Sequence, residues 1–154
     1  IAYEMLRAAG VPCLISQYRY SMFDRTVEEK SLPLAAEQGS GFIAFSPLAQ
    51  GLLTKKYLHG IPEHSRAARS TGFLKVDQVT EDKVGKARRL DEIAARRGQT
   101  LAEMALAWVL KDERMTSVIV GTSSVKQLAD NLHALDNLNF TNEELAEIEG
   151  ILRL

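Results

Sequence analysis

Two apolar runs of this sequence end in small, hydroxyl-bearing residues at which a phosphorylated ligand could bind. Residues 42–45 run into SPLAQG at 46–51, and residues 117–120 run into GTSS at 121–124. Short runs rich in β-branched and aromatic residues are typical of buried strands, and proline ends such a strand because it cannot donate to the ladder. Small residues then let a ligand approach the backbone. The second run leads into a helix start, where free N–H groups and the helix dipole favour phosphate.

Other side chains at these strand ends could bind the rest of such a ligand. Gln17 closes a predicted strand at 13–17, and its amide suits another planar amide. Phe45 offers a flat face, and Lys56 and Arg66 could neutralise a further phosphate. Ligands of parallel α/β folds bind at the carboxyl ends of the strands. The set therefore predicts a nicotinamide dinucleotide site.

Each of these residues also has a purely structural interpretation. Gln17 could cap a turn, Phe45 could belong to the core, and the basic stretch could be a solvated surface. Ser123 and Ser124 could only cap a helix.

Two other patterns are weaker. The three histidines, His59, His64 and His133, lack metal-ligand spacing, so no metal site is predicted. Residues 39–44 formally match the Gly-rich dinucleotide fingerprint, but they precede a strand where the fingerprint must follow one.

The elements that must position these residues alternate between helix and strand. Apolar periodicity, caps and turn residues predict strands at 13–17, 42–45 and 118–120 and helices at 2–9, 27–38 (interrupted by Pro33), 81–97, 100–111, 124–134 and from 141 onward. Capping boxes are predicted at Thr100, Ser124 and Thr141. Nearly continuous apolar strands between helices predict a parallel sheet covered on both faces. The longest irregular stretch, 48–75, is basic, and such a loop is usually functional or disordered.

Composition narrows the class of protein. The 154 residues are 45% hydrophobic and 25% charged with a net charge of −1, which fits one globular domain and gives no nucleic-acid signal. No apolar run approaches the ~18 residues of a membrane span. The single cysteine, Cys13, excludes an internal disulfide and fits a reducing cytoplasm. It lies in an apolar run and is interpreted as a small buried hydrophobe. The chain starts at Ile1 in what reads as the tail of a helix, which suggests a piece of a longer protein.

Several segments together resemble the aldo-keto reductases. They are FSPLAQGLLT at 45–54 with Lys56-Tyr57 and Gly60-Ile61-Pro62, and the stretches 100–110 and 117–131. The chain resembles above all the bacterial branch that reduces L-glyceraldehyde 3-phosphate, which is similar to the potassium-channel β subunits. The resemblance implies an α/β fold, a (β/α)8 TIM barrel that carries NADP(H) at its mouth. Residues 1–154 would form the C-terminal part of that single domain, about its last three β/α units plus C-terminal helices.

The resemblance also implies a role for each matching position. Gln17 would hold the nicotinamide carboxamide and Phe45 would stack on the ring. The residues implied at the pyrophosphate are Ser46, Pro47, Leu48, Ala49 and Gln50, with Lys56 and Arg66 in a lid along the phosphates. The residues implied at the adenosine and its 2′-phosphate are Gly121, Ser123, Gln127, Asp130 and Asn131.

The sequence departs from the family pattern at three neighbouring positions. Ser124 replaces an Arg that several relatives place against the 2′-phosphate, Tyr18 replaces a common Pro, and His64 replaces an aromatic residue. The family's catalytic tetrad of Asp, Tyr, Lys and His belongs to strands that this chain lacks, so no catalytic residue is assigned. Phe23 and the stretch 56–73 are expected to contact substrate.

The implied function is NADPH-dependent reduction of aldehydes or ketones to alcohols, with L-glyceraldehyde 3-phosphate or methylglyoxal as candidate substrates. The expected partner is a small carbonyl compound, without nucleic acid or membrane, and a homo-oligomer is left open. One alternative is an NADP(H)-binding regulatory subunit of the channel-β type with little turnover. Another is a free-standing three-stranded α/β domain of unrelated function, which would expose its strand edges.

Overall fold

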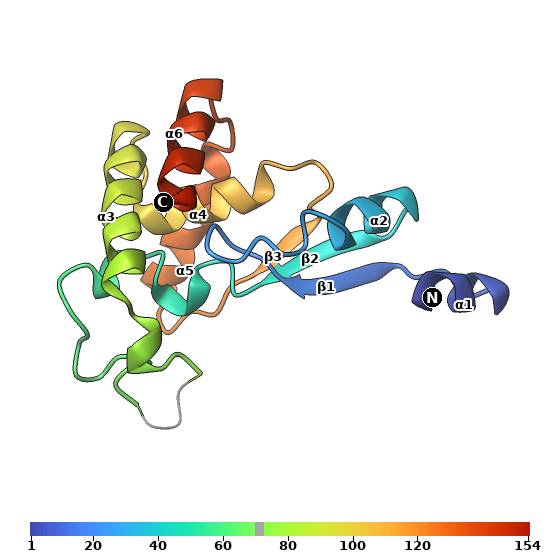
Figure 1. The fold of residues 1–154 in the computed structure, drawn as a ribbon, viewed down its shortest axis with the longest axis horizontal. Coiled ribbons are helices and arrows are strands. Elements are labelled where there is room, and N and C mark those ends of the chain that lie inside the picture. The colour runs from blue at the N-terminus through green and yellow to red at the C-terminus, as the bar shows by residue number, and fades with distance from the viewer. Residues whose placement is uncertain (70–72) are drawn as a thin grey trace.

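The computed structural model describes residues 1–69 and 73–154. Its strands are β1 (Ile15–Arg19), β2 (Gly41–Phe45) and β3 (Ser117–Ile119), which form one parallel sheet in the order β1-β2-β3. The helices are α1 (Ala2–Ala8), α2 (Ser31–Glu37), α3 (Glu81–Arg96), α4 (Leu101–Leu110), α5 (Val125–Leu132) and α6 (Asn142–Arg153). Figure 1 shows α3, α4 and α6 grouped at one end of the sheet and α1 beyond the other end. The predicted α/β class with a parallel sheet is confirmed.

The first strand lies two residues later than predicted. Pairing with β2 continues to Arg19, which lies opposite Phe45, and the Tyr20 N–H then donates to the Phe45 carbonyl at 3.3 Å. Gln17 is therefore inside the strand, opposite Ile43, and Arg19 is the residue at its carboxyl end. Local sequence placed the boundary wrongly because the length of a strand depends on its partner.

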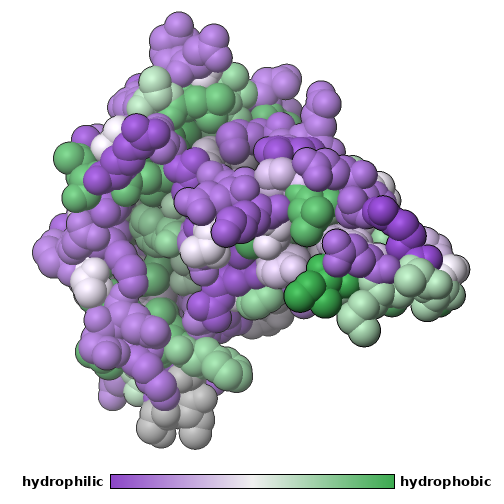
Figure 2. Space-filling view, turned by 45° about the vertical axis from the view of Figure 1, so that its right-hand side comes forward, coloured by the Kyte–Doolittle hydropathy of each residue, from purple (hydrophilic) through white to green (hydrophobic). Residues whose placement is uncertain are grey.

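The prediction that the sheet is covered on both faces is wrong for this chain. Phe42 and Ala44 of β2 are fully buried, whereas Ile43 and Phe45 on the opposite face are only half-buried. The neighbours on that open face include Ile15 and Ile119, which are 52% and 47% exposed. The apolar strands therefore carry a second face that the helices of this chain do not cover. Exposed hydrophobic side chains also gather on the arm that carries α1 and the start of β1 (Figure 2), where Leu14 is 76% exposed.

The helices follow their predicted faces and caps. In α3 the five predicted inward residues, Val84, Ala87, Leu90, Ile93 and Ala94, are the buried ones. Thr100 and Thr141 form the predicted capping boxes of α4 and α6. At α5 the Ser124 hydroxyl accepts from the Gln127 N–H, but the Gln127 side chain accepts from the Ser123 N–H. The predicted reciprocal bond is therefore shifted by one residue.

Two predicted helices differ from those observed. The predicted helix at 27–38 is only Ser31–Glu37, and Pro33 does not interrupt it. Proline fits there because the first turn of a helix does not need its N–H groups. Helix α4 is enclosed more widely than its predicted face of Leu101, Met104, Ala105 and Trp108, since Leu106, Ala107 and Val109 are buried as well.

In the stretch 48–75, residues 48–69 and 73–75 are folded over the sheet end rather than disordered. The stretch contains two short 3₁₀ turns, Ala49–Gly51 and Lys55–Tyr57, and a third turn follows at Val76–Gln78. Leu52, Tyr57, Ala67 and Leu74 form a small apolar cluster beneath it. The part of the predicted lid at 70–72 lies outside the described residues.

An ionic network fastens the loop after β1 to the C-terminal helix. Arg25 pairs with Glu28 at 2.8 Å and with Glu149 of α6, and its guanidinium lies 5.3 Å from the Trp108 ring. The Tyr20 hydroxyl donates to Glu28 at 2.7 Å, and burial together with that carboxylate raises the pKa of Tyr20. The hydrogen bond from Arg25 holds the pKa of Glu149 below its ordinary value.

A buried cation fastens α3 to the segment before α6. The Arg97 side chain is 2% exposed, pairs with Glu144, and donates to the carbonyls of Asn137 and Asn139 at 3.3 and 2.9 Å. Its guanidinium also lies 3.7 Å from the Phe140 ring centroid.

Three smaller points complete the fold. Cys13 is half-buried, less enclosed than the small core hydrophobe that was predicted. Within the described ranges, none of the helices combines the length and apolar content needed to cross a bilayer. In the same part of the chain, His, Cys, Asp and Glu side chains form no group of three or more that could hold a metal ion.

Candidate functional site

A cleft of ≈ 550 Å³ lies at the carboxyl ends of β2 and β3. Nine of the fourteen sequence-predicted site residues line it: Ser46, Pro47, Leu48, Gln50, Lys56, Arg66, Gly121, Ser123 and Gln127. The lining also includes Gly51, Thr54, His64, Arg69, Ile119, Val120 and Thr122. Segments some seventy residues apart meet here because β2 and β3 are neighbouring parallel strands. The size is within the range of ordinary ligand sites, about 300–1,000 Å³.

The backbone after β2 is held in an unusual conformation. Ser46, Ala49 and Gln50 have φ of +55°, +47° and +59°, and they are the non-glycine residues with positive φ among those described. The turn is fixed by the Ala49 N–H donating to the Ser46 carbonyl at 2.9 Å and the Gly51 N–H donating to the Leu48 carbonyl at 2.8 Å. A left-handed residue with a Cβ costs about 1–2 kcal/mol. Such strain gathers at ligand sites, where it presents backbone groups in a fixed direction.

Glycine is required at the end of this turn. Gly51 has φ +104°, and a Cβ there would lie 3.4 Å from Cε2 of Tyr57. Thr54 then donates its hydroxyl hydrogen to the Gly51 carbonyl at 2.7 Å and accepts from the Lys56 N–H at 3.2 Å. The hydroxyl of Thr54 therefore ties the turn to the basic segment that follows it.

The cleft is cationic. Lys56, Arg66 and Arg69 line it, and within the described residues none of the three has a carboxylate at ion-pair distance. Lys55, by contrast, turns away and pairs with Asp91 at 3.4 Å. Nη2 of Arg66 lies 3.9 Å from the place that a Cβ on Gly121 would occupy. The basic stretch thus reaches across the cleft to the loop after β3.

The wall after β3 ends in a helix N-terminus. Gln127 accepts at Oε1 from the Ser123 N–H at 2.9 Å, which closes the turn before α5. Asn131, one turn further along α5, is 8% exposed, and its Nδ2 is a buried donor with no hydrogen-bond partner among the described residues. Buried polar groups are nearly always paired, so this amide has an unused donor one turn along α5 from Gln127, which lines the cleft.

Five predicted residues do not line the cleft. Asp130 pairs with Lys126 at 2.8 Å on the surface of α5, and Asn131 is beneath that surface. Gln17 is exposed on the open face of β1. Phe45 is half-buried, and the Arg19 guanidinium lies 5.8 Å from its ring centroid. Ala49 lines a neighbouring cavity instead.

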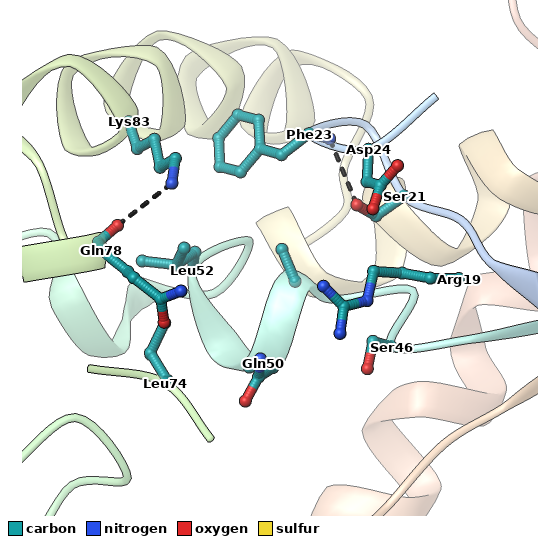
Figure 3. A pocket seen from close by; sticks show the side chains of 11 residues that line it. Arg19, Ser21, Phe23, Asp24, Ser46, Gln50, Leu52, Leu74, Gln78 and Lys83 are labelled. Atoms are coloured by element: carbon teal, nitrogen blue, oxygen red, sulfur yellow. Dashed lines mark hydrogen bonds between the residues drawn. The ribbon is translucent and has the colours of Figure 1, made fainter. Parts of the chain in front are cut away.

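That neighbouring cavity, of ≈ 220 Å³, shares Ser46 and Gln50 with the cleft (Figure 3). Among its other lining residues, sequence reasoning assigned no role to Arg19 or Lys83, and it also missed Thr54 and Arg69 of the larger cleft. The excess of basic residues over acidic ones between 54 and 76 could have identified Arg69. Arg19 had no such signal, because it becomes a strand-end residue only through its pairing with β2.

Comparison with known proteins identifies the family. Residues 1–153 match the model of the aldo/keto reductase family. The chain belongs to this family. It is 47% identical over 150 residues to a protein named L-glyceraldehyde 3-phosphate reductase from Escherichia coli O157:H7, and 45% identical over 150 residues to the protein of that name from E. coli K12. Each alignment covers 95% of this chain and 43% of the relative, so the chain spans less than half the length of these curated relatives.

This aldo/keto reductase chain has the parallel sheet expected of that family and a cleft at the carboxyl ends of the strands.

Proposed function

We propose that this chain is the cofactor-binding C-terminal part of an NADPH-dependent aldo/keto reductase that reduces aldehydes to alcohols. The observation that carries the proposal is the cleft lined by Ser46 and Gln50, two of the three left-handed residues after β2, together with cations that have no carboxylate partner among the described residues. A strained backbone loop opposite Lys and Arg side chains is suited to a diphosphate. The family match supports the oxidoreductase class independently.

The residues of the cleft fit a dinucleotide. We assign the diphosphate to Ser46, Leu48 and Gln50, with Lys56 and Arg66 as its counter-charges. The adenosine side would lie against Gly121, Ser123 and Gln127. Pro47 and Ala49 shape the turn, and Asp130 and Asn131 would complete the adenine side. The Nδ2 of Asn131 supports the assignment of this residue to the adenine side, because it is a buried donor without a hydrogen-bond acceptor among the described residues.

We place the nicotinamide end at Gln17 and Phe45, on the open face of the sheet. A bound reduced nicotinamide supplies a hydride for the carbonyl carbon of the substrate. In this proposal Gln17 orients the ring through its carboxamide, and Phe45 provides the face against which the ring lies. The Arg19 guanidinium, 5.8 Å from the Phe45 ring centroid, would move aside or border that position.

The proposal includes a preference for NADPH over NADH. His64 and Arg69 add an imidazole and a guanidinium to the cleft beyond the two cations assigned to the diphosphate. Ser124, by contrast, offers only a hydroxyl where several relatives carry an arginine.

We also propose that the remainder of the barrel and the catalytic tetrad lie outside residues 1–154. The half-exposed open face supports this proposal, since Ile15, Ile43 and Ile119 are apolar residues that a closed barrel would bury. The coverage of 43% of each E. coli relative agrees with it. A tyrosine of that other part would protonate the carbonyl oxygen.

The names of the relatives suggest the substrate. Both are called L-glyceraldehyde 3-phosphate reductases, so we propose a short phosphorylated aldehyde, with methylglyoxal as an unphosphorylated candidate.

The test uses the full-length protein that contains this chain. We expect NADPH to bind with a change in its fluorescence and to be oxidised when L-glyceraldehyde 3-phosphate or methylglyoxal is added. A variant with Ser46→Trp, which fills the cleft, should lose binding, whereas Arg89→Gln, which removes an exposed charge from α3 outside the cleft lining, should not. Failure to bind either NADPH or NADH would overturn the proposal. Binding without turnover of any aldehyde would favour the regulatory alternative.

A further inference from the structure

The second cavity, at the carboxyl ends of β1 and β2, is a candidate for a ligand group that the dinucleotide cleft does not explain. Its ≈ 220 Å³ lie between the loop after β1, the turn after β2 and the start of α3. Figure 3 shows the Arg19 guanidinium directed into this space from one side and Lys83 bordering it from α3. Phe23 and Leu52 provide apolar walls. The volume is below the range of drug-sized sites, about 300–1,000 Å³, so a ligand of few atoms is the appropriate size.

The charge of this cavity favours an anion. Arg19 and Lys83 line it against the single carboxylate of Asp24. Neither cation has an ion-pair partner among the residues that the structure describes, and the Lys83 ammonium donates to the Gln78 carbonyl at 3.3 Å. Asp24 accepts from the Thr26 hydroxyl at 3.0 Å. Most other Arg side chains of the chain are paired, among them Arg25 and Arg97. A guanidinium and an ammonium that line one cavity without an ion-pair partner among the described residues supply the charges that a phosphate would neutralise.

The position of the cavity relates it to the proposed hydride donor. It shares Ser46 and Gln50 with the dinucleotide cleft, so the two spaces adjoin. Arg19 is two residues beyond Gln17 on the same face of β1, because side chains alternate along a strand. Its Cζ lies 5.8 Å from the centroid of Phe45, the residue assigned to the nicotinamide ring. An anion held at Arg19 would therefore sit beside the place where a substrate carbonyl must lie.

We infer that Arg19 and Lys83 bind the phosphate of a short phosphorylated aldehyde and thereby determine substrate specificity. This inference rests on the proposed function, since it assumes reduction of a carbonyl beside Phe45. Arg19 provides two parallel N–H donors and Lys83 a point charge, while Phe23 packs against the carbon chain. Asp24 limits the net charge of the cavity to +1, which favours a small anion that exchanges readily over a tightly held one.

The test compares two substrates that differ in the phosphate alone, glyceraldehyde 3-phosphate and glyceraldehyde, in the full-length protein. The readout is the ratio of their kcat/KM values, which cancels effects on folding and on hydride transfer. We expect Arg19→Gln to lower this ratio about 10-fold or more, and Lys83→Gln to lower it about 3- to 10-fold. Arg19→Lys should restore part of the ratio. Arg89→Gln, which removes an exposed charge from α3 outside the cavity, should leave the ratio within about twofold.

The outcomes separate the two proposals. If Arg19→Gln and Lys83→Gln leave the ratio unchanged while the native protein reduces both aldehydes, the inference about this cavity is wrong and the proposed function stands. If the native protein reduces methylglyoxal but neither of these two aldehydes, the inference is wrong and the proposed function stands. If it reduces none of the three with NADPH or NADH, the proposed function fails and the inference fails with it. If either variant weakens NADPH binding about 10-fold in a fluorescence titration without changing the ratio, the cavity serves the cofactor phosphates, which overturns the inference.

Discussion

The left-handed turn after β2 makes a quantitative prediction about Gln50. Its φ and ψ are +59° and +21°, a conformation that glycine adopts freely and alanine does not. We compare Gln50→Gly with Gln50→Ala, because both remove the side chain and differ only in the Cβ. The Cβ costs about 1–2 kcal/mol in this conformation, and glycine loses about 0.5–1 kcal/mol more backbone entropy on folding. Gln50→Gly should therefore be the more stable of the two by about 0.5–1 kcal/mol.

The matched control is an exposed helical position, Glu92 of α3. There alanine should be more stable than glycine by about 1 kcal/mol, the usual helical order. The difference in unfolding free energy between the glycine and alanine variants should thus have opposite signs at the two positions. The two differences should lie about 1.5–2 kcal/mol apart. The measurement is the free energy of guanidinium-induced unfolding of the full-length variants, at constant protein concentration.

The same variants test whether the strain orients the turn for binding. Gln50→Gly should bind NADPH roughly threefold more weakly than Gln50→Ala, because its turn must be ordered on binding. At position 50 the alanine variant could instead be more stable than the glycine variant, by the same amount as at Glu92. In that case the turn is not left-handed in solution and the reasoning fails. If the stabilities differ as expected but the two variants bind NADPH with equal affinity, the strain exists but does not orient the turn for binding.

Three further predictions follow from the charges of the chain. Arg66→Gln should raise the Kd for NADPH about 10-fold at low salt and make its salt dependence shallower, and an unchanged salt slope in fluorescence titrations would refute a phosphate contact. Arg97→Met should lower the free energy of unfolding by about 1.5–3 kcal/mol, because it removes the ion-pair partner of Glu144 and a charged donor to the carbonyls of Asn137 and Asn139, and a loss below about 1 kcal/mol in denaturant unfolding would refute the network. Because the hydrogen bond from Arg25 lowers the pKa of Glu149, the stability that Glu149 contributes is present above its ordinary pKa of 4.5 and is lost as the pH falls through the lowered pKa. The stability difference between the native protein and Glu149→Gln should therefore shrink as the pH falls from 4.5 through the lowered pKa, and a difference independent of pH in thermal unfolding would contradict the ion pair.

Much of the helical structure could be predicted because its signals are local. The inward face of α3 and the capping boxes at Thr100 and Thr141 each depend on residues within a few positions of one another. The strand after Ser40 and its break at Pro47 were equally local. The boundaries of β1 were not, since hydrogen bonds to β2 carry it on to Arg19.

The site divides in the same way between local and distant causes. The sequence alone identified the two loops, 46–51 and 121–124, because small residues after an apolar run have a recognisable order. It also identified Lys56 and Arg66 as basic residues of a long irregular stretch. It could not identify the positive φ at three residues with side chains, because nothing in Ser, Ala or Gln marks that conformation.

By itself, the sequence determined the helix faces, the caps and the chemical character of the strand ends, because neighbours along the chain decide them. Only the tertiary structure decided that Arg66 reaches the loop at Gly121, that Arg19 and Lys83 share a second cavity, and that one face of the sheet is open. The reason is that parallel strands bring together residues far apart in the chain. Which residues then meet depends on register and loop path, which no local pattern records.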